Sequence, residues 1–185
     1  MGHRWLFFRR WIANPRQMGS IVPTSSAACR LLAGRVLEEP YDHVIEVGSG
    51  TGVVSQALLD AGIPPERLLL VEIEPMMAAL LRKRFPNVAV IQGDAVDLAQ
   101  HLPARFRGRV SHVVCGVPLM LLPFEVQRQF VEAVEQVAPG RGFLQLSYQL
   151  RSPIPADRLG LDARRICWTL RNIPPAGVWR YQPEA

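Results

Sequence analysis

The residues best suited to chemistry are three carboxylates that each stand at or near the end of an apolar run. The first, Glu46, lies in residues 44–47, and three glycines follow at alternate positions, Gly48, Gly50 and Gly52. Such glycines let the backbone turn tightly against a ligand, and a following helix offers free N–H groups. The dinucleotide fingerprint G-x-G-x-x-G is not met, because Val53 stands where its third glycine would fall. An acid beside the turn would repel a pyrophosphate, so the pattern favours a ligand with a cationic end. The plain alternative is an ordinary turn between a strand and a helix.

The other two carboxylates follow the next two apolar runs. Glu72 comes twenty positions after Gly52, which is the reach at which an acid at the end of a second strand meets ribose hydroxyls. Asp94 follows residues 88–92 in the tripeptide Gly93-Asp94-Ala95, which alone predicts only a turn from strand to helix. Glu74, placed before Pro75, is expected to be a helix cap or a surface acid.

These residues require an alternation of strands and helices to position them. Apolar, strand-like runs are expected at residues 44–47, 67–73, 88–92, 110–116 and 142–150. Helical patterns are expected at residues 27–37, 53–59, 76–85 and 124–137. Thr24 or Ser25 would cap the first of these helices. Residues 163–170 and 178–181 read as an antiparallel hairpin. The pattern predicts an α/β fold with a mostly parallel sheet, in which buried parallel strands are nearly continuously apolar.

The first eighteen residues have a different character. On a helical wheel, five large side chains fall within one half, Trp5, Phe7, Phe8, Trp11 and Ile12. Arg9 and Arg10 lie on the other half, a composition typical of an interfacial membrane anchor. We predict an amphipathic membrane-binding helix and linker at residues 1–18 and a catalytic domain at residues 19–185. The alternative is a helix that packs its aromatic side chains on the core.

Composition limits the remaining choices. A chain of 185 residues fits one domain, and its net charge of +5 comes almost entirely from arginine, because Lys83 is the only lysine. This suits a phosphate-bearing partner, although an arginine-biased genome would also explain it. Three cysteines far apart, Cys29, Cys115 and Cys167, support neither a metal site nor a disulfide. With no spanning segment and no signal peptide, we expect a cytoplasmic, peripherally bound monomer without a metal.

The motif of an acid followed by alternating glycines, together with Glu72 and Asp94, resembles the class I S-adenosylmethionine-dependent methyltransferases. The resemblance implies a Rossmann-like fold with a seven-stranded sheet and S-adenosyl-L-methionine as cofactor, leaving S-adenosyl-L-homocysteine. Asp94 would then bind the adenine amino group. The implied cofactor-binding residues are Ser20, Ser25, Glu46, Gly48, Ser49, Gly50, Gly52, Glu72, Ile73, Gly93, Asp94 and Ala95.

The whole chain is similar to bacterial phospholipid N-methyltransferases, which convert phosphatidylethanolamine towards phosphatidylcholine. The similarity rests on G-S-I-V-P-T-S-S at residues 19–26, V-E-I-E-P at 71–75, G-V-P-L at 116–119 and N-I-P-P-A-G-V-W-R-Y at 172–181. It implies in-line methyl transfer to a lipid amine at the inner face of the bacterial membrane. The Gly116 carbonyl and Tyr148 would orient the amine, although Tyr148 is equally well explained as a structural strand aromatic. The implied substrate and membrane contacts are Trp5, Phe8, Arg9, Arg10, Trp11, Arg16, Pro118 and Leu119.

The ribosomal RNA adenine dimethyltransferases are the competing family. They place an Asn and an aromatic residue around a proline after the fourth strand, where this chain has Cys115, Gly116 and Leu119. The chain therefore lacks the amide and the stacking ring, and we expect no nucleic-acid partner. A cofactor-binding membrane adaptor without activity is a further alternative. His112, a lone strand histidine, is expected to be structural, with a catalytic base as its alternative.

Overall fold

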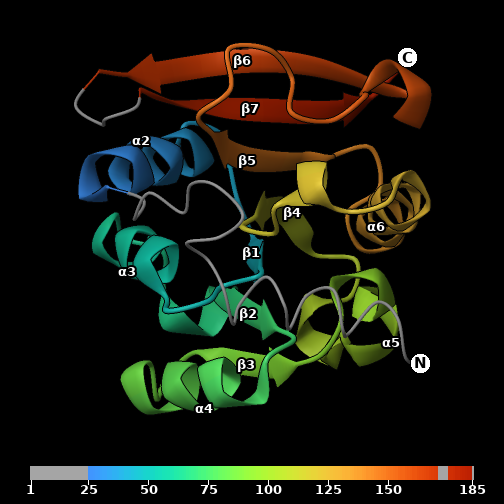
Figure 1. The fold of residues 1–185 in the computed structure, drawn as a ribbon. Coiled ribbons are helices and arrows are strands. Elements are labelled where there is room, and N and C mark those ends of the chain that lie inside the picture. The colour runs from blue at the N-terminus through green and yellow to red at the C-terminus, as the bar shows by residue number, and fades with distance from the viewer. Residues whose placement is uncertain (1–24, 171–174, 185) are drawn as a thin grey trace.

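The computed structural model describes residues 25–170 and 175–184, and within them one sheet carries helices on both faces (Figure 1). The strands are β1 His43–Val47, β2 Leu68–Glu72, β3 Ala89–Gln92, β4 Val110–Cys115, β5 Phe143–Ser147, β6 Leu161–Thr169 and β7 Ala176–Pro183. The helices are α2 Ser26–Leu37, α3 Val53–Asp60, α4 Pro75–Arg84, α5 Leu98–His101 and α6 Phe124–Val137. The predicted helix at residues 1–18 lies outside the described residues.

The seven strands are arranged in the order β3-β2-β1-β4-β5-β7-β6. The strands from β3 to β5 in this order pair in parallel, and β7 inserts antiparallel between β5 and β6. The predicted α/β, Rossmann-like fold with an antiparallel hairpin at the C-terminal side is therefore confirmed. One expected boundary was wrong: β5 ends at Ser147, so Tyr148 belongs to the segment that follows the strand.

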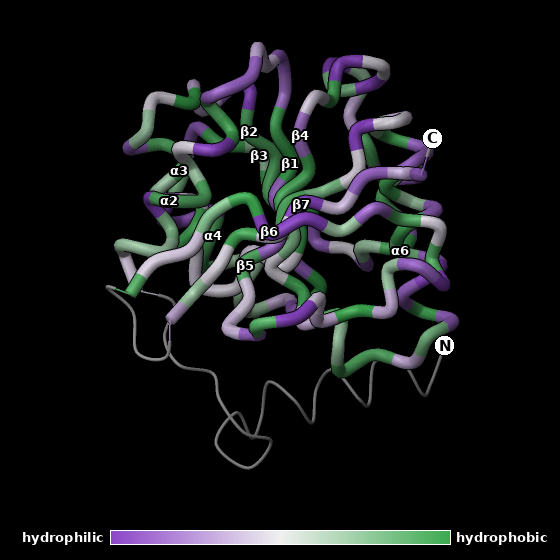
Figure 2. Tube along the Cα trace, turned by 90° about the horizontal axis from the view of Figure 1, so that it is seen from above, coloured by the Kyte–Doolittle hydropathy of each residue, from purple (hydrophilic) through white to green (hydrophobic). Residues whose placement is uncertain are grey.

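Two apolar layers hold the helices on the sheet. On one face, side chains of α2, α3 and α4 such as Leu32, Leu58 and Leu81 pack together with Val44 of β1. On the other face, Phe130 of α6 packs with Ile45 of the same strand. Every residue of β1 is buried, as expected for a parallel strand covered on both sides. Figure 2 shows this pattern as hydrophobic central strands surrounded by more hydrophilic segments.

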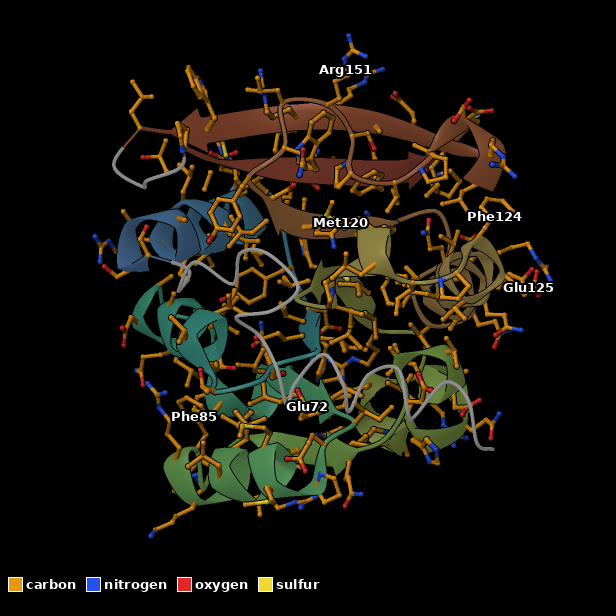
Figure 3. The ribbon with its side chains drawn as sticks, in the orientation of Figure 1. Glu72, Phe85, Met120, Phe124, Glu125 and Arg151 are labelled. Atoms are coloured by element: carbon orange, nitrogen blue, oxygen red, sulfur yellow. The ribbon has the colours of Figure 1, made fainter. Side chains whose placement is uncertain are left out.

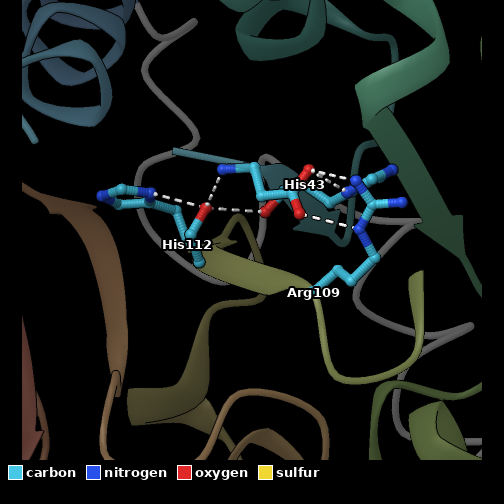
Figure 4. A network of polar contacts seen from close by, with 5 residues as sticks. His43, Arg109 and His112 are labelled. Carbon is cyan, nitrogen blue, oxygen red and sulfur yellow. Dashed lines mark hydrogen bonds and ion pairs between the residues drawn. The ribbon is translucent and has the colours of Figure 1, made fainter. Parts of the chain in front are cut away.

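Polar side chains join the amino-terminal ends of β1 and β4 (Figure 4). The backbone N–H of Asp42 donates to Ser111 Oγ at 3.0 Å, and Ser111 Oγ donates to the His43 carbonyl at 3.1 Å. His112 is buried beside Ser111, with its Nδ1 3.3 Å from Ser111 Oγ, and burial lowers the pKa of its ring. This network lies at the amino-terminal ends of the strands, at the opposite end of β1 from the glycine turn. The position of His112 therefore agrees with the structural role expected of it.

Two helix caps were also predicted correctly. Ser25 caps α2, and its side chain accepts a hydrogen bond from the Ala28 backbone N–H at 3.2 Å. Glu74 caps α4 by accepting from the Met77 N–H at 2.7 Å. None of the described helices has the length and apolar character that crossing a bilayer requires.

Candidate active site

The glycine turn connects β1 to α3 through backbone conformations that suit glycine. Gly48, Gly50 and Gly52 have φ values of 72°, 53° and 78°. A Cβ on Gly48 would lie 2.8 Å from a methyl carbon of Val117, and one on Gly52 would lie 2.5 Å from the ring of Phe85. Two of the three glycines are therefore required by close packing as well as by φ.

Glu72 fixes the shape of this turn from the end of β2. Its Oε2 accepts from the Gly50 N–H at 2.7 Å, and its Oε1 accepts from the Glu74 N–H at 3.0 Å. The side chain is buried and bonded to the turn, and Figure 3 labels Glu72. Each carboxylate oxygen has a second lone pair, so the group can organise the turn and still accept from a ligand hydroxyl.

Glu46 is enclosed more completely than the sequence suggested. Only 1% of the residue is exposed, and Ser55 Oγ of α3 donates to its Oε2 at 2.6 Å. Burial, followed by the charge of Glu72, raises the pKa of Glu46 to about 8, while the bond from Ser55 opposes this. Glu46 is thus mostly protonated at neutral pH before any ligand binds, and its contact with a cationic ligand remains a prediction. Ser55 was not identified as part of the site from the sequence.

A cavity of about 370 Å³ opens beside the turn, between the ends of β1 to β4 and the start of α6. Six predicted residues line it, namely Gly48, Ile73, Gly93, Asp94, Ala95 and Leu119. The wall is completed by Val117, Leu122 and Pro123 of the apolar segment after β4, and by five further apolar residues that no motif in the sequence indicated, Val47, Val71, Val96, Val126 and Phe130. Asp94 is the one charged side chain of this lining, and its Oδ1 accepts from the Val96 N–H at 3.2 Å.

Of the remaining predicted cofactor residues, Ser49 and Ser25 do not line this cavity, and Ser20 lies outside the described chain. Ser49 is buried, and its hydroxyl donates to the Glu46 carbonyl at 3.2 Å. Ser25 has the capping role given above, and its contact with the cofactor remains a prediction. Ser20 and the proposed membrane contacts Trp5, Phe8, Arg9, Arg10, Trp11 and Arg16 fall outside the described residues.

Residues 116–123 follow β4, where the sequence predicts that the methyl acceptor enters. We call this segment the acceptor loop, and it lies directly against the glycine turn. The Gly116 N–H donates to the Val47 carbonyl at 2.8 Å, and a Cβ on Gly116 would lie 2.5 Å from the Gly48 carbonyl oxygen. Glycine at position 116 is therefore explained by the close approach of two backbones. Its carbonyl remains a candidate for orienting an amine.

Two buried glutamines hold the acceptor loop near its two ends. Gln145 of β5 donates through Nε2 to the Val117 carbonyl at 2.8 Å, and Gln127 of α6 donates to the Leu122 carbonyl at 2.9 Å. Neither glutamine belonged to a motif, and a polar residue within an apolar strand was the only signal for Gln145.

The apolar side chains of the acceptor loop do not all face the surface. Leu119 is fully buried and lines the cavity, whereas Pro118 is half-buried. Met120 is exposed instead (Figure 3). Tyr148 directly follows β5 and is half-buried, but it is not among the residues that line the cavity. Its part in orienting an amine therefore stays a prediction.

The residues present suit an adenosyl ligand with a charged amino-acid end. The glycine turn borders the cavity through Gly48, and a Cβ on Gly50 would meet nothing within 4 Å. Glu72 can accept from ribose hydroxyls, and Asp94 can accept from an exocyclic amine. Among the described residues, no group of three or more His, Cys, Asp or Glu side chains is arranged to hold a metal ion. Fold and site together define an α/β enzyme that uses a nucleoside cofactor.

Comparison with known proteins identifies the family. A methyltransferase domain model matches residues 44–142. An ornithine lipid N-methyltransferase of Singulisphaera acidiphila is 32% identical over 95% of this chain and 93% of that protein. The ribosomal RNA small subunit methyltransferase A of Chlorobium phaeobacteroides (strain BS1) is 28% identical over 56% of this chain, and the matched region covers 40% of that protein.

Solved structures agree on the fold. The 1,6-didemethyltoxoflavin-N1-methyltransferase of Burkholderia thailandensis, determined with S-adenosylhomocysteine, superposes with a TM-score of 0.66 at 15% identity, over 98% of this chain and 89% of that one. An O-methyltransferase from Bacillus cereus in complex with S-adenosylhomocysteine superposes with a TM-score of 0.64 at 13% identity, over 97% of this chain and 90% of that one. The chain belongs to the class I S-adenosylmethionine-dependent methyltransferases, and S-adenosylmethionine is its cofactor.

Proposed function

We propose that this enzyme methylates the headgroup amine of a membrane aminolipid, with phosphatidylethanolamine and its mono- and dimethyl forms as the first candidates. The observation that carries the proposal is the relationship to the ornithine lipid N-methyltransferase, which extends over nearly the whole length of both proteins. Transfer of three methyl groups to phosphatidylethanolamine would yield phosphatidylcholine.

The chemistry of the acceptor loop supports an aliphatic amine as the acceptor. Residues 117–123 carry only apolar side chains, so the loop offers neither an amide nor an aromatic ring to a flat base. The Gly116 carbonyl can accept a hydrogen bond from an amine, and aromatic rings hold methylated ammonium groups by cation–π contact. Tyr148 is the candidate for the second task.

When bound, S-adenosylmethionine supplies an electrophilic methyl group on a sulfonium sulfur. Glu72 and the glycine turn would hold its nucleoside, Asp94 would receive the adenine amino group, and Glu46 would face its ammonium group. Since an aliphatic amine is nucleophilic once neutral, the contribution of the protein is chiefly alignment. The amine proton would leave to water.

The proposal is tested by following a radiolabelled methyl group into three acceptors presented separately. These are vesicles containing phosphatidylethanolamine, vesicles containing an ornithine lipid, and ribosomal RNA. The two lipids both carry a free amine, and the ornithine lipid has no phosphodiester. An Asp94→Ala variant, expected to bind the cofactor more weakly, controls for label that does not depend on the site.

Label in phosphatidylethanolamine is the expected result. Label in the ornithine lipid alone would show that the substrate is an ornithine lipid and not phosphatidylethanolamine. The proposal that the acceptor is a lipid amine would still stand. Label in RNA, or in none of the three, would refute lipid methylation, and the absence of all transfer would revive the alternative of a membrane adaptor.

A place on the inner face of the cytoplasmic membrane follows from the lipid substrate. We expect a monomer that binds reversibly, with residues 1–13 providing part of the affinity through Trp5, Trp11 and their arginine neighbours. Deleting residues 1–13 should then reduce sedimentation with anionic liposomes and leave cofactor affinity unchanged. Equal sedimentation of the two chains would count against this role for the segment.

A further inference from the structure

Three large apolar side chains are exposed together at the outer edge of the sheet. Leu150 is 77% exposed, Trp168 54% and Leu170 70%. Trp168 is the next-to-last residue of β6, Leu170 follows the strand, and Leu150 belongs to the segment after β5. Single exposed apolar residues are ordinary on a protein surface, whereas a contiguous group bordered by polar residues marks an interaction site. We call Leu150, Arg151, Arg165, Trp168 and Leu170 the β6 patch.

Arg165 contacts two members of this patch, Leu150 and Trp168. Its guanidinium group donates to the Leu150 carbonyl at 3.4 Å, and its central carbon lies 5.7 Å from the centre of the Trp168 ring. Gly177 of β7, which pairs with Trp168, leaves room for this arrangement, because a Cβ there would lie 3.0 Å from Arg165 Cδ. Arg165 therefore joins two separate segments, the one after β5 and the end of β6.

The fold places the patch on an edge strand, next to the segment that carries Tyr148. β6 pairs with β7 alone and runs parallel to β5, since both strands are antiparallel to β7. The segment after β5 crosses over β6 and β7 in Figure 1, and the labelled Arg151 points away from the body of the molecule in Figure 3. The exposed surface is thus continuous with the segment that begins at Tyr148.

The charge of the patch indicates what covers it. The only charged residue in residues 147–156 is Arg151, and those in residues 163–170 are Arg164 and Arg165. Arg164 is paired with Asp162, but within the described part of the chain no carboxylate forms an ion pair with Arg151 or Arg165. Two unpaired arginines beside exposed Trp and Leu side chains match an anionic bilayer surface, where indole rings and arginine stems lie at the headgroup level. If two copies of the chain paired through this patch, the arginines of one copy would face those of the other and repel them.

We propose that the β6 patch docks on an anionic lipid bilayer and brings the Tyr148 segment to the membrane surface. The proposal rests on the proposed lipid substrate, since an enzyme that methylates headgroups must meet them at the surface. The β6 patch would be a second membrane contact besides the N-terminal segment, and it belongs to the folded domain itself. Trp168 and Leu170 enter the headgroup region, and Arg151 and Arg165 contact lipid phosphates.

The fluorescence of Trp168 tests the contact directly in the full chain. Vesicles of phosphatidylcholine with about 30% phosphatidylglycerol are prepared with and without bromine on the acyl chains, which quenches only an indole at the bilayer. The Trp168→Phe variant keeps an apolar surface and removes the probe, so the difference between wild type and variant isolates this residue among the four tryptophans. We expect this difference signal to be quenched by half or more. Binding to vesicles without quenching of this signal would overturn the proposal, and so would a failure to bind.

A second experiment measures how much the patch contributes and separates docking from catalysis. The double variant Trp168→Ser/Leu170→Ser should bind the same vesicles at least tenfold more weakly. Its matched control is Met76→Ser/Leu80→Ser on α4, where two apolar side chains are also exposed, and its binding should stay within twofold of wild type. Equal losses in both double variants, or burial of Trp168 in a dimer, would refute the assignment.

Transfer to a short-chain aminolipid dissolved below its micelle concentration does not require docking. The patch variant should therefore match wild type on this substrate and lose activity on vesicles. Loss of activity on both would show that the patch acts within the active site and overturn docking as its role. If wild type itself methylates neither form of lipid, the proposed function fails, while the quenching result still decides whether the patch meets the bilayer.

Discussion

Replacing Glu46 with glutamine preserves the shape of a fully enclosed side chain and removes its titratable proton. In the wild-type protein, burial and the nearby Glu72 raise the pKa of Glu46 from the ordinary 4.5 to about 8, despite the hydrogen bond from Ser55. This rise corresponds to about 5 kcal/mol, at 1.36 kcal/mol for each pKa unit. Cys29 also faces Glu46, but burial raises the pKa of its thiol to about 11, so it stays neutral in the range of interest.

Glu46 should therefore contribute to the pH dependence of stability, and comparison with Glu46→Gln separates its contribution from those of other titrating groups such as His112. Below pH 4.5 the carboxyl is protonated in both the folded and the unfolded state. Between pH 4.5 and 8 the unfolded state alone releases the proton, so the free energy of unfolding falls as pH rises. Relative to Glu46→Gln, wild type should lose roughly 3 kcal/mol between pH 5 and 8. Urea unfolding of both proteins across this range measures the difference.

The binding of cofactor should also release a proton if Glu46 faces the cationic end of the ligand. With a pKa of about 8, the carboxyl holds about 0.9 proton at pH 7, and an ammonium partner would expel most of it. Titration calorimetry in two buffers with different ionisation enthalpies counts the protons released. Subtracting the Glu46→Gln result removes the contribution of the ligand's own amino group. Equal proton release in the two proteins would show that Glu46 does not meet the ligand and refute the reasoning.

Three further substitutions test how the site is built. Gly142→Ala would place a Cβ 1.7 Å from the Tyr181 carbonyl oxygen at a φ of 62°, so unfolding experiments should show a loss of about 3 kcal/mol; a loss below about 1 kcal/mol would contradict this contact. Gly116→Ala would place a Cβ 2.5 Å from the Gly48 carbonyl oxygen, and calorimetry should show cofactor affinity reduced about tenfold, from overpacking of about 1–3 kcal/mol. Unchanged affinity would mean that loop and turn separate without cost. Gln145→Leu removes the donor to the acceptor loop, which should lower kcat/KM about tenfold, since an unpaired buried carbonyl costs about 1–3 kcal/mol. A wild-type kcat/KM would contradict this role of the donor, and Gln145→Glu, which offers an acceptor in place of the amide donor, should not restore the rate.

Much of the fold could be predicted from local patterns in the sequence. The helix at Phe124–Val137 was predicted to the residue, because its apolar positions recur at helical spacing between Pro123 and Pro139. The strands before the glycine turn and before Asp94 were located by apolar runs that end in glycine. Turn glycines and strand runs act over a few neighbouring residues, so they can be read without tertiary information. The end of β5 could not, because pairing with Gly177 stops at Ser147.

The walls of the site depend on contacts between distant parts of the chain. Val126 and Phe130 line the cavity because α6 packs over the ends of β1 and β4, and on its own α6 is an ordinary amphipathic helix. Ser55 and Gln145 are common residue types at positions where no short motif marks them. Their roles follow from proximity to Glu46 and to the acceptor loop, which only the folded chain creates.

The acceptor loop and the glycine turn are coupled so closely that they must act as one unit. Gly116 leaves no space for a side chain against Gly48, and Gln145 fixes the next residue of the loop from β5. A change in the loop backbone would therefore disturb the cofactor side of the site as well. Variation in acceptor choice within such a framework has to come from side chains that project away from the turn, such as the exposed Met120. Substitutions on the apolar outer face of the loop can thus change which acceptor fits, including the proposed lipid, while the cofactor geometry stays constant.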